Sequence, residues 1–102
     1  MESNDKFGEA WEKTLKKYYG VELVPNSGAG RKKGDATIGT FLIDAKATRA
    51  KQYTIRKEDF NNISCYADRI GRTGVLCLNI SGLELLVLPL GYLPWIAEME
   101  QK

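Results

Sequence analysis

The chain has 102 residues and a formal net charge of +2, and its length fits a single domain over residues 1–102. It contains no histidine, which excludes Ser-His-Asp and Cys-His nucleophiles and histidine-bound metal centres. It has no apolar run of about 18 residues, so we expect no transmembrane helix and no membrane partner. The N-terminus lacks the apolar stretch of a signal peptide. Cys65 and Cys77 do not form a CxxC motif, and we expect both to be reduced in a cytoplasmic protein.

The first half of the chain predicts a helix followed by strands. Apolar residues at helical spacing predict a helix over about residues 5–19, and Gly20 can end it. Residues 21–24 predict a short strand that stops at a proline. Residues 26–34 form a loop with several glycines and three consecutive basic residues. Residues 35–47 then predict a β-hairpin that turns at a Gly-Thr pair.

The second half predicts a helix between strands. Residues 54–70 have a helical apolar stripe, an acidic first turn and a basic end, which matches the helix dipole. Residues 75–80 are almost entirely apolar and predict a buried central strand. Residues 83–88 predict a further strand, and residues 93–99 a short helix. This order predicts the α/β (α+β) class, with a mixed central sheet flanked by helices.

The predicted hairpin brings acidic residues together. Its turn pairs residues 36–38 with residues 41–43, and one step further it pairs Asp35 with Asp44. Opposed side chains have Cβ atoms roughly 5 Å apart, and Asp44 and Lys46 share a face because they are two apart on a strand. Opposed carboxylates repel unless a cation lies between them, and such oxygen ligands suit Mg²⁺ or Mn²⁺. A lysine beside the ion could hold a phosphate or an attacking water.

Positive charge is concentrated around these residues. The only acids between residues 31 and 57 are Asp35 and Asp44, and residues 73–101 contain no lysine or arginine. This asymmetry predicts a polyanionic partner, with a solvated lysine-rich surface as the alternative. The eight basic residues are Arg31, Lys32, Lys33, Lys46, Arg49, Lys51, Arg56 and Lys57.

These residues resemble the PD-(D/E)xK nuclease superfamily, and most closely its small Holliday-junction resolvases. The family pattern is a helical Glu, a Gly/Ser-rich loop, an acid that enters a hairpin, and (D/E)-x-K on the next strand. Here the matching residues, within a resemblance that covers about residues 7–88, are Glu9, Ser27 in the loop 26–30, Asp35, and Asp44-Ala45-Lys46. Gly34 replaces the proline of the motif, and Asp44 replaces the Glu that resolvases usually carry.

The resemblance implies a restriction-endonuclease-like αβββαβ core and a metal-dependent DNA endonuclease that is selective for branched DNA. Its Mg²⁺ (or Mn²⁺) would be bound by Asp35, Asp44 and the Ala45 carbonyl, with Glu9 completing the shell directly or through water. Lys46 would act on the attacking water, so the catalytic candidates are Glu9, Asp35, Asp44 and Lys46. The expected DNA-binding residues are Ser27, Arg31, Lys32, Lys33, Arg49, Lys51, Arg56 and Lys57.

The resemblance also implies a homodimer, for which the apolar C-terminal third is the candidate interface. That segment contains Leu86, Leu88, Leu90, Tyr92, Leu93 and Trp95. The site residues have plainer alternatives: Asp35 could be a turn residue, Asp44 and Lys46 could face solvent on an edge strand, and Glu9 could be an ordinary surface residue. The alternative function is a nuclease-like fold that binds nucleic acid or a protein without cleaving it.

Overall fold

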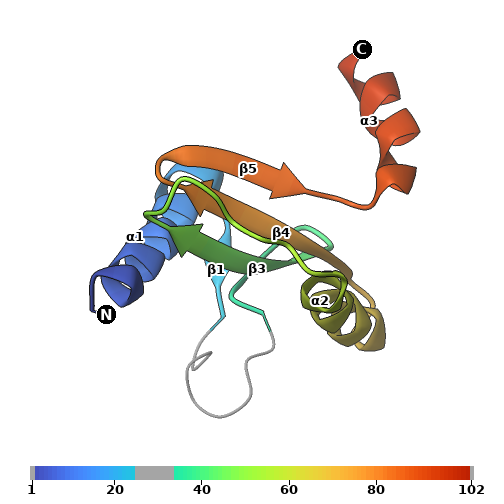
Figure 1. Ribbon diagram of the computed structural model, residues 1–102. Coiled ribbons are helices and arrows are strands. Elements are labelled where there is room, and N and C mark those ends of the chain that lie inside the picture. The colour runs from blue at the N-terminus through green and yellow to red at the C-terminus, as the bar shows by residue number, and fades with distance from the viewer. Residues whose placement is uncertain (1, 25–33, 102) are drawn as a thin grey trace.

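The computed structural model describes residues 2–24 and 34–101, in which helices cover both faces of a five-stranded mixed sheet (Figure 1). This confirms the predicted mixed sheet flanked by helices. The elements follow one another in the order that the resemblance predicts for a restriction-endonuclease-like core. That the protein has this particular core stays a prediction. The elements are α1 (Glu2–Tyr19), β1 (Glu22–Leu23), β2 (Ala36–Ile38), β3 (Phe41–Thr48), α2 (Lys57–Arg69), β4 (Thr73–Ile80), β5 (Leu83–Val87), the 3₁₀ helix η1 (Leu90–Tyr92) and α3 (Leu93–Glu100).

The strands lie in the order β1-β2-β3-β4-β5. All neighbours are antiparallel except β3 and β4, which are parallel and are joined through α2, the kind of crossover that parallel strands need. The predicted hairpin register is confirmed, because residues 36–38 pair with residues 41–43. The central position of β4 is confirmed as well, since it pairs with β3 on one side and with β5 on the other.

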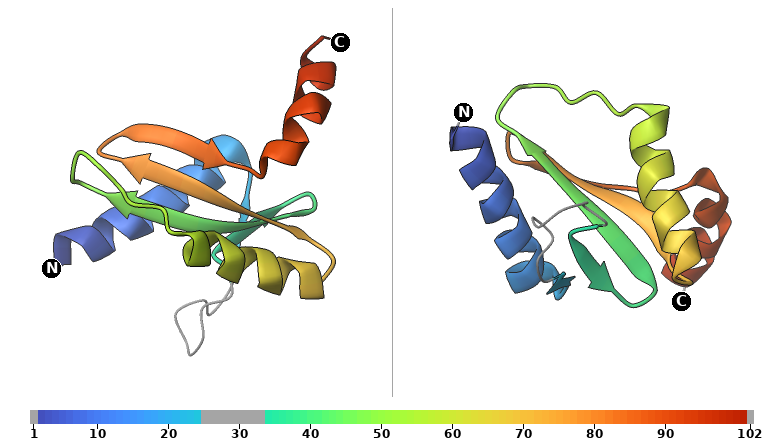
Figure 2. Two further views of the ribbon diagram at one scale, coloured as in Figure 1. Left: turned by 45° about the vertical axis from the view of Figure 1, so that its right-hand side comes forward. Right: turned by 90° about the horizontal axis from the view of Figure 1, so that it is seen from below.

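The two faces of the sheet carry separate cores. Ile43, Val75 and Cys77 pack against α1, and Leu42 and Leu76 pack against α2, since successive strand residues point to opposite faces. The two helices lie on opposite sides of the strands (Figure 2). By the same alternation, Asp44 and Lys46 lie on the α2 face, so the candidate site shares its face of the sheet with α2.

The second helix begins three residues later than predicted. Residues 54–56 are not helical, and Arg56 is extended, at φ −98° and ψ 152°, as the N-cap residue. The Arg56 N–H donates to Oδ2 of Asp59 at 3.1 Å, which satisfies one backbone donor before the first helical turn. The helix passes so close to β4 that a Cβ on Gly74 would lie 2.8 Å from the backbone of Ile63. Glycine is therefore what allows α2 to approach the sheet.

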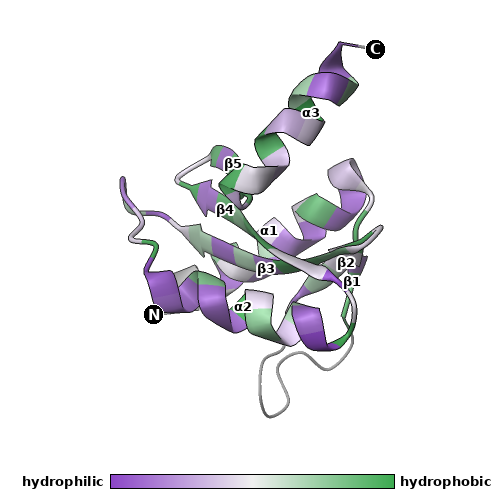
Figure 3. Ribbon diagram, turned by 90° about the vertical axis from the view of Figure 1, so that its right-hand side faces the viewer, coloured by the Kyte–Doolittle hydropathy of each residue, from purple (hydrophilic) through white to green (hydrophobic). Residues whose placement is uncertain are grey.

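The C-terminal helix α3 extends beyond the β5 edge and stands clear of the rest of the protein (Figure 3). Its surface carries hydrophobic residues, and Leu93, Trp95 and Met99 are exposed. In the part of the chain that the structure describes, no helix combines the length and apolar character needed to cross a membrane.

Candidate metal site and nucleic-acid interface

Asp35 lies immediately before β2 and is buried, with 1% of its surface exposed. Its N–H donates to the carbonyl of Ile43 at 2.7 Å, and its own carbonyl accepts a hydrogen bond from the N–H of Val24 at 2.9 Å. The predicted ladder pair of Asp35 with Asp44 is wrong, because β2 begins only at Ala36 and Asp35 bonds to the residue before Asp44. Asp35 nevertheless connects β1 to β3 at the entrance of the hairpin.

Gly34 explains why the hairpin starts in this way. Its φ is +107°, a region that glycine enters easily and other residues rarely adopt. A Cβ at this position would also lie 2.8 Å from Cδ1 of Leu42. Proline, the residue of the family motif, fixes φ near about −65° and could not adopt this conformation. The departure from the motif is therefore consistent with the local backbone.

The Asp35 carboxylate lies against β3. Its Oδ2 accepts a hydrogen bond from the Ala45 N–H at 2.7 Å. The N–H and C=O of one strand residue point to the same edge of the strand, so the Ala45 carbonyl is directed to the side on which Asp35 lies. The pairing of β2 with β3 has already ended at Ile43. This edge therefore brings together a carboxylate and a backbone carbonyl, both of them oxygen ligands.

Asp44 and Lys46 project from the same face of β3, as predicted. Lys46 Nζ lies 3.8 Å from Asp44 Oδ1, and the two side chains are 37% and 16% exposed respectively. The Oδ1 atoms of Asp35 and Asp44 are both inaccessible to solvent. A partly exposed ion pair of this kind contributes only about 0–1 kcal/mol to stability. Its main consequence here is to hold a positive charge beside a carboxylate.

Tyr53 is a site residue that the sequence reasoning missed. It lies in the segment between β3 and α2 and packs against the core on the α2 face. Burial raises its pKa above the ordinary value of 10.0; Asp59 and Asp44 raise it further, while Lys46 and Arg56 oppose the rise. Its phenol therefore lies within electrostatic reach of both Asp44 and Lys46. The path of this segment back across β3 depends on tertiary packing, so no local sequence signal indicated it.

Glu9 is placed differently from the other candidates. It is exposed on α1, the helix that covers the face opposite Asp44 and Lys46. Among residues 2–24 and 34–101, no group of three or more Asp, Glu or Cys side chains is arranged to hold a metal ion. The structure therefore brings Asp35, Asp44 and Lys46 together at β3 without adding Glu9 as a third carboxylate.

The described basic candidates lie at the end of β3 and the start of α2. Arg49, Lys51, Arg56 and Lys57 are all exposed, and the Arg49 guanidinium lies 4.9 Å from the centre of the Phe7 ring. Arg56 and Lys57 lie at the N-terminus of α2, where backbone N–H groups favour the binding of phosphate. Four further candidates lie outside the described residues: Ser27, Arg31, Lys32 and Lys33.

The chemistry of the donor set fits a Mg²⁺ or Mn²⁺ ion. Mg²⁺ is usually bound through one or two carboxylates, with waters and substrate phosphates as its remaining ligands. Asp35 and Asp44 are the carboxylates that could bind such an ion, and the Ala45 carbonyl lies on the same edge as Asp35. An ion bound in this mode needs no third carboxylate, so the exposed position of Glu9 is compatible with it.

A scan against models of protein families, a search of curated proteins and a search of solved structures each found no match for this chain. The resemblance to the PD-(D/E)xK nucleases therefore depends on the residues of this chain alone. Any function assigned to the site has to follow from the chemistry of Asp35, Asp44, Ala45 and Lys46 and from the charges around them.

Proposed function

We propose that this protein is a Mg²⁺- or Mn²⁺-dependent DNA endonuclease that hydrolyses phosphodiester bonds. The observation that carries this function is the hydrogen bond from the Ala45 N–H to Oδ2 of Asp35, because it sets a buried carboxylate beside the strand that bears Asp44 and Lys46. Neighbouring carboxylates disfavour each other's charged form, and a divalent cation bound to both offsets that repulsion. Asp35, Asp44 and the Ala45 carbonyl would hold this ion.

Hydrolysis requires a water to attack phosphorus while the bond from phosphorus to the leaving sugar oxygen breaks. The metal ion, when bound, would stabilise negative charge on the phosphate and lower the pKa of the attacking water. Lys46, held 3.8 Å from Asp44, would orient that water and place its own positive charge beside the phosphate. The water loses a proton to solvent, and the leaving sugar oxygen takes one up.

The basic residues around the site support DNA as the substrate. Arg49 and Lys51 follow β3, and Arg56 and Lys57 begin α2, so four exposed positive charges flank the strand that carries Asp44 and Lys46. Contacts of this type neutralise phosphates and fix the position of the duplex without reading its sequence. We infer selectivity for branched DNA, as in the resolvases that the chain resembles, and a homodimer that provides one active site for each of two strands.

A cleavage assay with different metal ions tests this function. Labelled linear and four-way-junction DNA should be cut in Mg²⁺ or Mn²⁺ and left intact in EDTA. Ca²⁺ should support DNA binding without cleavage, because it prefers more ligands and longer bonds than Mg²⁺. Undiminished cleavage in EDTA by the purified protein would exclude the metal-dependent mechanism.

The second candidate function is a DNA-binding module that does not cleave. It is favoured by the position of Glu9, which adds no third carboxylate to the site within the described part of the chain. Such a module would bind DNA equally well in Mg²⁺ and Ca²⁺ and would give no product with any divalent ion. The same assay therefore separates the two functions.

A further inference from the structure

The strand β5 forms one edge of the sheet, since among the described residues it pairs with β4 and with no other strand (Figure 1). A two-residue turn joins β4 to β5. Ser81 and Gly82 have φ of 51° and 100°, the positive values of a type I′ turn. Ile80 and Leu83 flank this turn and face each other in the ladder. They form a hydrogen-bonded pair, because the C=O before such a turn accepts from the N–H after it.

This turn directs the backbone N–H and C=O groups of Glu84 and Leu86 away from the sheet. Hydrogen-bonded and non-hydrogen-bonded pairs alternate in an antiparallel ladder, so with Leu83 bonded to β4 these two residues face outwards. Natural edge strands are blunted by lysine, proline, bulges or inward charges. β5 has no lysine or proline, and its five residues pair with β4 without a bulge. The edge is therefore open to a further strand.

The side chains of β5 have the pattern of a strand that is covered on both faces. Four of its five residues are apolar, which is typical of a strand inside a sheet rather than at its edge. Leu83, Leu85 and Leu86 are nevertheless 58%, 42% and 59% exposed. Successive residues alternate between the two faces, so this apolar surface lies on both sides of the edge. A strand added beside β5 would cover part of it.

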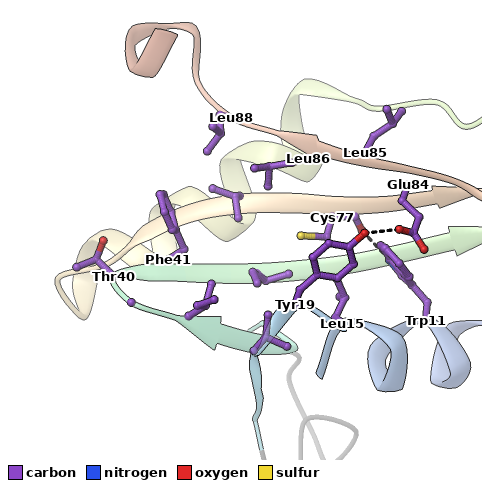
Figure 4. Close-up of a pocket in the computed structure, with 15 residues that line it drawn as sticks. Trp11, Leu15, Tyr19, Thr40, Phe41, Cys77, Glu84, Leu85, Leu86 and Leu88 are labelled. Carbon is purple, nitrogen blue, oxygen red and sulfur yellow. Dashed lines mark hydrogen bonds between the residues drawn. The ribbon is translucent and has the colours of Figure 1, made fainter. Parts of the chain in front are cut away.

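On the α1 face, the edge borders an apolar groove of about 630 Å³ (Figure 4). Leu86 and Glu84 line the groove from β5, and Trp11 and Tyr19 line it from α1. Among the described residues of the lining, Glu84 is the only charged one. Its carboxylate accepts a hydrogen bond from the Tyr19 hydroxyl, but this donor is neutral, and no described residue forms an ion pair with Glu84. The groove therefore suits apolar side chains with one positive charge at its edge.

We propose that β5 receives an extended segment of a partner protein as an additional strand, with a lysine or arginine of that segment opposite Glu84 and apolar residues around it. In this mode of recognition, backbone hydrogen bonds provide affinity and alternate side chains provide specificity. A side chain opposite Leu86 would enter the groove, and opposite charges on neighbouring strands stabilise the pairing.

The charge of Glu84 argues for a partner other than β5 of a second copy. Residues 73–101 contain no lysine or arginine, so a second β5 could not offer a cation to Glu84. The proposal does not depend on cleavage. It also leaves Leu93 and Trp95 of α3 free for the proposed homodimer.

A synthetic peptide, acetyl-Ser-Val-Ile-Val-Lys-Val-Ser-amide, tests this strand addition. When it lies antiparallel to β5, its lysine can stand opposite Glu84 and its isoleucine opposite Leu86. Bound peptide should slow amide hydrogen exchange at Glu84 and Leu86 about tenfold or more, because their N–H groups gain acceptors. Unchanged exchange at these two amides, or slowing confined to α2 or α3, would overturn the proposal.

Exchange of the charges tests the pairing with Glu84. Glu84→Lys should lower the affinity for this peptide about tenfold, and should raise the affinity for the peptide with glutamate in place of lysine by a similar factor. Glu98→Lys is the control, because it makes the same charge change at an exposed position on α3 and should alter neither affinity. Equal effects of the two variants would overturn the proposal. Slow exchange at Glu84 and Leu86 that grows with protein concentration in the absence of peptide would show pairing between copies, and would overturn it as well.

Discussion

The Ala45 N–H donates to Oδ2 of Asp35 at 2.7 Å, just beyond Ala36 and Ile43, the outermost paired residues of β2 and β3. The side chain of Asp35 thus takes the place of a ladder partner. The strand itself, rather than a flexible side-chain network, positions the buried carboxylate relative to Asp44 and Lys46. The geometry of the candidate site therefore depends on how the chain enters the hairpin.

Substitution of Gly34 tests that dependence. Gly34→Ala places a Cβ at φ +107° and 2.8 Å from Leu42. It should lower the free energy of unfolding by about 1–2 kcal/mol or more, the cost of a non-glycine residue in such a region. Gly8→Ala is the matched control, because a Cβ there has no neighbour within 4 Å and Gly8 lies within α1. That control should stabilise by about 0.5–1 kcal/mol. Urea unfolding measures both, and equal effects would contradict the structure.

The parts of the site that follow strand periodicity were predictable from the sequence. A two-residue turn fixes the pairing of residues 36–38 with residues 41–43, and a spacing of two puts Asp44 and Lys46 on one face. The class of fold followed from the order of helical and strand patterns. These features depend on local geometry, which the sequence encodes directly.

The parts that depend on tertiary contacts were not predictable. The position of Asp35 relative to Asp44 depends on the positive φ of Gly34, which a strand pattern does not indicate. The start of α2 depends on the bond between Asp59 and the Arg56 N–H. Tyr53 comes within electrostatic reach of Lys46 because the segment after β3 packs against the core on the α2 face of the sheet.

Tyr53→Phe should weaken DNA binding without changing the fold. Tyr53 lies within electrostatic reach of Lys46, and its protonated phenol can donate to a phosphate there; burial raises the pKa of Tyr53 and so extends the protonated form to higher pH. Removing one neutral hydrogen bond of about 1 kcal/mol should raise the dissociation constant roughly fivefold. Because Tyr53 is not assigned to the chemical step, the cleavage rate at saturating DNA should stay the same. A fluorescence titration in Ca²⁺ checks the affinity, and an unchanged value would remove Tyr53 from the interface.

The two cysteines should differ in reactivity. Burial raises the pKa of Cys77 from 9.0 to about 11, whereas Cys65 is exposed on α2. Near pH 8 the thiolate fraction of Cys77 is then about a hundredth of that of an ordinary thiol, so a thiol reagent should modify one cysteine rapidly and the other slowly. Equal rates of modification for Cys65 and Cys77 would contradict the burial of Cys77 in the core.

The same pKa shift determines how stability changes at alkaline pH. The thiol of Cys77 ionises in the unfolded chain near its ordinary value of 9.0, while the folded protein keeps its proton until about pH 11. Below the pKa of the thiol in the unfolded chain, 9.0, the neutral thiol contributes its full stabilising effect. The free energy of unfolding should therefore fall between these two values as the pH rises. Cys77→Ala should lose this part of the pH dependence in chemical unfolding experiments.

DNA affinity should depend steeply on salt, with a log–log slope of about −0.9 for each phosphate neutralised. Arg49→Gln together with Lys51→Gln should flatten the slope by about 1.8 if each residue contacts one phosphate. The pair Lys6→Gln and Arg69→Gln removes the same charge at exposed positions elsewhere, and should leave the slope nearly unchanged. Titrations in Ca²⁺ at several salt concentrations measure these slopes, and an equal change in both double variants would contradict the assignment of Arg49 and Lys51 to the interface.

Selectivity for junctions is tested by competition of a four-way junction against a linear duplex of equal length in Ca²⁺. The junction should bind more tightly, and equal affinity for both DNAs would discard selectivity for junctions.

The most direct measurement is the single-turnover rate of cleavage of labelled DNA in Mg²⁺ by Asp44→Asn and Lys46→Ala. Both should lose about 10²-fold or more in rate, the scale of removing one electrostatic contact to the transition state. Both should remain folded, and Asp44→Asn should not lower the thermal midpoint, since it removes a carboxylate near Asp35. Asp68→Asn, at an exposed position on α2, is the control and should cleave like the unmodified protein. Full activity in folded Asp44→Asn or Lys46→Ala would contradict the assignment of this site.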